Sequence, residues 1–136
     1  MPKRRRGSRA TPRRRAGRHL PFETLVERAL AEIPDPFRAA LAEVAIVIDD
    51  DLSPEQRRDN DLLPDEDLYG LYEGVPRTEY GADWQSVPNR ITLFRIPLEA
   101  DFADPAELAE EVRITVIHEL AHHLGIDDDR LEELGV

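Results

Sequence analysis

One long helix constrains the fold of this chain more than any other feature of its sequence. Asp104 and Pro105 form a typical helix start, a side-chain cap followed by proline at the first helical position. An apolar pattern with helical period continues from there to about Leu124, and Gly125 ends it. Projected at about 100° per residue, the apolar side chains cover most of the circumference. We therefore predict a helix that is buried on most sides and faces a cleft along one polar stripe.

Three shorter helical segments are expected around this helix. The apolar residues of 22–33 recur with helical period until Pro34 and Pro36 interrupt it, and residues 37–41 resume it. A last short helix is predicted over 127–134.

Two segments have the composition of strands. The β-branched run 44–48 is apolar on both faces, which is typical of an interior strand. Residues 90–96 contain polar interruptions and end at Pro97, which favours a strand near a sheet edge. Prolines and glycines predict loops over 51–88, with at most one helical turn after Ser53. This order of elements predicts an α+β fold in which a small mixed sheet packs on the long helix.

The charges of the chain divide it into two parts. Nine of its 18 basic side chains lie in residues 1–20, which contain no acid, and the other nine accompany 29 acidic side chains, a formal charge of −20. The first segment has almost nothing apolar to bury, so we predict a disordered basic tail, 1–20, and one domain, 21–136. The tail is open to three interpretations: weak electrostatic contact with a polyanion such as nucleic acid, docking on the acidic domain, or solubilising disorder.

Composition also excludes several classes of protein. The chain has no cysteine, which excludes disulfide scaffolds and thiolate metal sites, so a metal would be held by His and carboxylate side chains. No apolar run approaches the roughly 18 residues that a membrane span needs. The arginines of the tail are not followed by the apolar stretch of an export signal. We therefore expect a soluble, cytoplasmic protein without membrane contact.

The polar stripe of the long helix carries a metal-ligand motif. His118 and His122 are four residues apart, so both imidazoles can reach one metal ion from the same face. Glu119 follows the first of them and can reach a water on that metal without being a ligand. Gly125 can turn the chain sharply, and Asp128 lies three residues beyond it as the natural third ligand. Three protein ligands leave a fourth position for water, as in catalytic zinc sites.

The complete pattern, H-E-x-x-H-x-x-G-x-x-D, is specific. In a chain with 4 His and 7 Gly, chance would produce it at a level on the order of 10⁻⁴. The chemistry that it predicts is hydrolysis by a metal-activated water. Zn²⁺ would lower the pKa of a bound water, and Glu119 would act as general base and return the proton to the leaving amine.

The motif resembles that of the zincin metallopeptidases. Together with the short chain and the segment Leu71-Tyr72-Glu73-Gly74-Val75-Pro76, it is similar to the minimal zincin-like family of small bacterial metallopeptidases, over about residues 21–136. The resemblance implies a compact zincin-like domain with zinc on His118, His122 and Asp128, and with Glu119 as the catalytic carboxylate. It also implies that 90–96 is the edge strand to which an extended peptide adds.

Several alternatives remain open at this point. The histidines could belong to a solvated polar stripe, and Asp127, Asp128 or Asp129 could each cap the last helix. His123 cannot share the metal of its neighbours on a regular helix and is expected to be packed or behind the ligands. Packing is also the default for the aromatic residues, any of which could stabilise an oxyanion: Tyr69, Tyr72, Tyr80 and Trp84. The alternative function is a metal-stabilised binding module of little or no activity, whose basic tail contacts an anionic partner.

Overall fold

The computed structural model describes residues 4–5, 21–74 and 89–135. Its elements, in chain order, are β1 (Arg4–Arg5), α1 (Phe22–Ala31), α2 (Phe37–Ala40), the 3-10 helix η1 (Leu41–Glu43), β2 (Ala45–Asp49), α3 (Pro54–Asp59), β3 (Asp67–Leu68), β4 (Gly70–Glu73), β5 (Arg90–Phe94), α4 (Arg95–Asp101), α5 (Pro105–Leu124) and α6 (Asp128–Glu133). They form a small mixed sheet and a set of helices, which confirms the α+β prediction.

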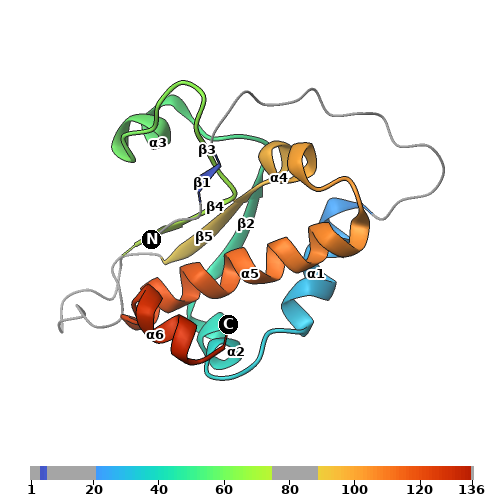
Figure 1. Cartoon of the computed structure of the whole chain (residues 1–136), viewed down its shortest axis with the longest axis vertical. Coiled ribbons are helices and arrows are strands. Elements are labelled where there is room, and N and C mark those ends of the chain that lie inside the picture. The colour runs from blue at the N-terminus through green and yellow to red at the C-terminus, as the bar shows by residue number, and fades with distance from the viewer. Residues whose placement is uncertain (1–3, 6–20, 75–88, 136) are drawn as a thin grey trace.

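The long helix is confirmed at both ends. The Asp104 side chain caps α5 by accepting the N–H of Glu107 at 3.1 Å, and Gly125 ends the helix in the left-handed conformation with φ 75°. Helix α5 packs against α1 on one side and against β4 and β5 on the other, so its apolar circumference forms the centre of the main core. Figure 1 shows α5 crossing in front of the sheet, with α1 beside it. Among the described residues, no helix is long and apolar enough to cross a membrane.

The order of the strands corrects two predictions. In the described part of the chain the sheet has the order β2-β5-β4, with β5 parallel to β2 and antiparallel to β4. The run 44–48 was therefore wrongly predicted to be interior, and 90–96 was wrongly predicted to be an edge strand that accepts a peptide. The polar Thr92 does not mark an edge, because it is buried between the two neighbouring strands at 1% exposure.

The segment 51–88 was predicted as loops, and this was wrong for part of it. Strands β3 and β4 occupy 67–68 and 70–73, and α3 after Ser53 has six residues, with a reciprocal capping box between Ser53 and Gln56. Strand β5 also ends earlier than expected, at Phe94, and α4 begins at Arg95 with Pro97 in its first turn. The high density of proline and glycine concealed these short elements.

The described part of the basic tail is strand β1. Its two residues pair antiparallel with β3, Arg4 opposite Leu68 and Arg5 opposite Asp67. The rest of the tail, 1–3 and 6–20, lies outside the described residues, so its disorder stays a prediction.

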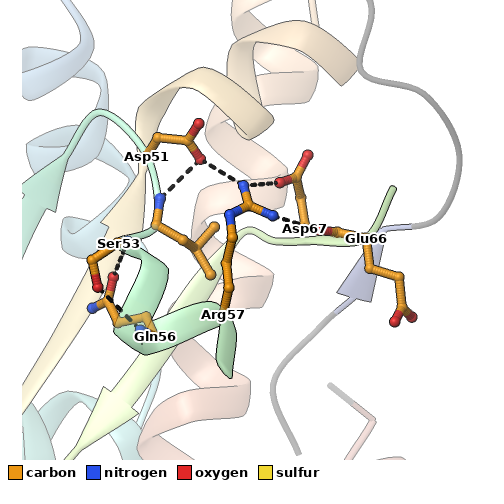
Figure 2. A network of polar contacts seen from close by, with 7 residues as sticks. Asp51, Ser53, Gln56, Arg57, Glu66 and Asp67 are labelled. Carbon is orange, nitrogen blue, oxygen red and sulfur yellow. Dashed lines mark hydrogen bonds and ion pairs between the residues drawn. The ribbon is translucent and has the colours of Figure 1, made fainter. Parts of the chain in front are cut away.

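A polar network centred on Arg57 fixes α3 against the end of β2 and the start of β3. The guanidinium donates to Asp67 Oδ1 at 2.7 Å, to Asp51 Oδ1 at 3.3 Å and to the Glu66 carbonyl oxygen at 3.0 Å. Figure 2 shows these contacts converging on Arg57 from the turn after β2 and from the start of β3. Because Asp67 is buried, its carboxylate depends on hydrogen bonds of this kind.

Arg57→Met is expected to lower the free energy of unfolding by about 2–3 kcal/mol, because the buried Asp67 loses a charged donor while the apolar stem is retained. Urea denaturation measures the change. The neighbouring Arg58→Met is the matched control, since Arg58 is exposed and its replacement should stay within about 0.5 kcal/mol. Equal stabilities for the two variants would contradict a structural role for this network.

Candidate metal and catalytic site

Helix α5 and the start of α6 carry all four residues of the predicted site. His118 is half-buried, His122 is exposed and Glu119 is completely buried, so the three lie at different depths on the last turns of α5. Asp128 is exposed and is the first residue of α6. The helix thus presents the two histidines toward its surface and directs the carboxylate between them into the sheet.

The cap of α6 decides between the three consecutive aspartates. The Asp127 side chain accepts the N–H of Arg130 at 2.9 Å and is the N-cap of the helix. Capping by Asp128 or Asp129 is therefore excluded. Asp128 remains available for another role, and its charge already acts on Glu119.

Glu119 accepts one hydrogen bond at Oε1, and its other carboxylate oxygen, Oε2, has no hydrogen-bond partner among the described residues. Its Oε1 accepts the backbone N–H of Tyr72 at 2.8 Å. Its Oε2 is buried and has no hydrogen-bond partner within the described part of the chain. Burial raises the pKa of Glu119 to about 7, the Tyr72 hydrogen bond opposes this rise, and the charge of Asp128 adds to it. A buried carboxylate with a raised pKa and an unused oxygen has the properties of a general base.

Strand β4 brings Tyr72 to this carboxylate. Tyr72 donates its N–H to Glu119, and so β4 is bonded on one side to β5 and on the other side to α5. The close approach of strand and helix depends on Gly70, where an added Cβ would lie 2.6 Å from Thr115 Cγ2. A glycine at this position therefore sets the spacing between β4 and α5.

Gly70→Ala is expected to cost about 1–3 kcal/mol of unfolding free energy, because strand and helix must separate to admit the methyl group. The variant Thr115→Ser removes the methyl group that the alanine would meet. Combined with Gly70→Ala, it should recover most of that loss in a thermal or urea denaturation series. Additive losses in the double variant would show that the steric contact is not the cause.

Tyr72 contacts both the predicted base and a predicted ligand, and the sequence did not indicate these contacts. It was one of four aromatic residues assigned to packing by default. Its ring lies 5.2 Å from the His122 ring, measured between centroids, and its backbone holds Glu119. Two of the other three, Tyr80 and Trp84, lie outside the described residues. The signal present in the sequence was the segment 71–76, which carried the family resemblance without indicating a role for Tyr72.

The metal site itself stays a prediction. Among the described residues, no group of three or more His, Asp or Glu side chains is gathered closely enough to hold a metal ion. The donor types nevertheless suit zinc, since two imidazoles one helical turn apart and one exposed carboxylate are a common catalytic ligand set. Glu119 lies between the two histidines in the sequence, and its Oε2 has no hydrogen-bond partner among the described residues. This arrangement suits a general base for a metal held by those histidines.

Comparison with known proteins places the chain in a family. The family model of the zincin-like metallopeptidases matches residues 41–136, which include β2, the sheet, all of α5 and α6. No curated protein matches the chain. The match covers more than half of the sequence and contains both the predicted ligands and the strand that positions Glu119. The chain therefore belongs to the zincin-like metallopeptidase family.

Proposed function

We propose that this protein is a zinc-dependent peptidase in which His118, His122 and Asp128 hold the metal and Glu119 is the general base. The substrates are peptides or proteins. Family membership supports peptidase chemistry in general, and the assignment of these four residues is our proposal. When bound, zinc would polarise a peptide carbonyl and lower the pKa of a water molecule.

The observation that carries the proposal is the state of the Glu119 carboxylate. One oxygen is fixed by the Tyr72 N–H at 2.8 Å, and this bond orients the other, Oε2, which is buried without a partner in the described chain. A carboxylate in this state can take a proton from water at Oε2 and later release it to the leaving amine. Leaving a buried acceptor unpaired costs about 1–3 kcal/mol, and the place of Glu119 on α5 next to the two predicted ligands gives its Oε2 a use that offsets this cost.

Metal content and hydrolysis of the full chain test the proposal. The purified protein, supplied with zinc, is expected to bind one zinc ion per chain and to cleave members of a mixed pool of unstructured peptides. A chelator should abolish the cleavage, and added zinc should restore it. Failure to bind stoichiometric zinc would refute the proposal. Stoichiometric zinc without any cleavage would favour the metal-stabilised binding module instead.

A further inference from the structure

A buried polar chain runs behind the predicted metal ligands. His123 follows His122 on α5 and is completely buried. Its Nε2 lies 2.7 Å from Glu43 Oε1, and its Nδ1 lies 3.1 Å from the Tyr72 hydroxyl. The side chain of Glu43 is 43% exposed and reaches inward from η1 to make this contact. Both imidazole nitrogens therefore have partners. Their hydrogen bonds fix the orientations of the Glu43 side chain and the Tyr72 hydroxyl, which an apolar residue at this position would not do.

Tyr72 connects this chain to the predicted active site. Its hydroxyl contacts His123 and also donates to Asn89 Oδ1 at 3.0 Å. Its ring lies against the ring of His122, and its backbone N–H binds Glu119 Oε1 at 2.8 Å. One residue thus contacts the polar chain through its hydroxyl, a predicted ligand through its ring and the predicted base through its backbone.

We infer that Glu43, His123 and Asn89 are positioning residues that act through Tyr72 on Glu119 and His122. The inference rests on the function proposed above. Two hydrogen bonds at the hydroxyl end fix the rotation of the Tyr72 ring, and the ring fixes the strand that carries the N–H donor. Glu119 Oε2 is then held in one orientation, and the Tyr72 ring restricts the rotation of the His122 ring on the side where the two rings pack. Correct orientation of a reacting group contributes to rate rather than to substrate binding.

The experiment compares three isosteric variants of the full-length, zinc-loaded protein. Tyr72→Phe removes only the hydroxyl and keeps both the ring beside His122 and the N–H to Glu119. Glu43→Gln keeps the shape of the side chain and removes its charge. Tyr69→Phe is the matched control, because Tyr69 is equally buried, also lies near β4 and loses one hydrogen bond, to Asp101.

Tyr72→Phe and Glu43→Gln are each expected to lower kcat about tenfold, less than the roughly 10²-fold cost of a full 1 Å misplacement. KM and the zinc Kd should change less than about threefold, since neither variant removes a ligand or a substrate contact. Tyr69→Phe should also lower Tm, because it loses the hydrogen bond to Asp101, and should leave kcat unchanged. The double variant Glu43→Gln/Tyr72→Phe should be no slower than the worse single variant, because Glu43 reaches the site only through His123 and the Tyr72 hydroxyl that the second substitution removes.

A measurement without substrate completes the test. In NMR spectra of the full chain, the His123 Nε2 proton is expected to be protected from exchange with water in the wild type and to exchange faster in Glu43→Gln, where an uncharged amide oxygen accepts a weaker hydrogen bond. Unchanged kcat in both variants of an active wild type would overturn the positioning role and leave the proposed function standing. A wild type that binds no zinc and cleaves nothing would refute the proposed function itself.

Discussion

Glu119→Gln is expected to reduce peptide hydrolysis by about 10²–10⁴-fold while the protein still binds zinc. Glutamine has almost the same shape as glutamate, and its amide oxygen can still accept the Tyr72 N–H that holds Oε1 in the wild type. The amide cannot take a proton from water at the position of Oε2, so only the base is lost. The loss should therefore appear in kcat, with little change in KM. Steady-state kinetics on a single cleaved peptide, with zinc measured in the same samples, provide the test.

Glu111→Gln is the matched control for this variant. Glu111 is also a buried glutamate of α5, two turns before Glu119, and is within 3.4 Å of the Thr115 hydroxyl. The same chemical change at this position should leave hydrolysis near the wild-type rate. A Glu119→Gln protein that hydrolyses as fast as Glu111→Gln would show that another group is the base.

The local elements of this fold were largely predictable, and the sheet was not. The ends of α5 depend on Asp104, Pro105 and Gly125, which act within one turn of the chain, so their effects can be recognised in the sequence. The order of strands depends on partners far away in the chain. Run 44–48 has the apolar composition of a central strand. In the described sheet, however, it pairs only with β5, and the central position belongs to β5, which has β2 on one side and β4 on the other.

The candidate site divides in the same way. The spacing of His118, Glu119 and His122 is a property of one helix and is therefore visible in the sequence. The contact between Glu119 and Tyr72 joins residues 47 positions apart, and it depends on how β4 lies against α5. The same reason kept the role of His123 hidden. Its helical angle showed only that it does not share the metal of its neighbours, and its partners Glu43 and Tyr72 come from two other elements.

Asp128, the proposed third metal ligand, can be tested against a closely matched control variant. Asp128→Asn is expected to raise the zinc Kd by more than about 100-fold, beyond the 10–100-fold that loss of a residue behind a ligand costs. The amide is a much weaker zinc donor than the carboxylate it replaces. The measurement is competition with a zinc chelator of known affinity.

Asp129→Asn is the control for this last variant, because it makes the same change of charge at the next residue of α6. Both positions are exposed, and neither is the cap, since Asp127 holds the Arg130 N–H. General electrostatic attraction of the acidic domain for a cation would weaken equally in the two variants. Ligation by Asp128 would instead weaken binding in Asp128→Asn alone. Equal zinc affinities in the two variants would therefore exclude Asp128 as a ligand. The third ligand beside His118 and His122 would then be a different residue.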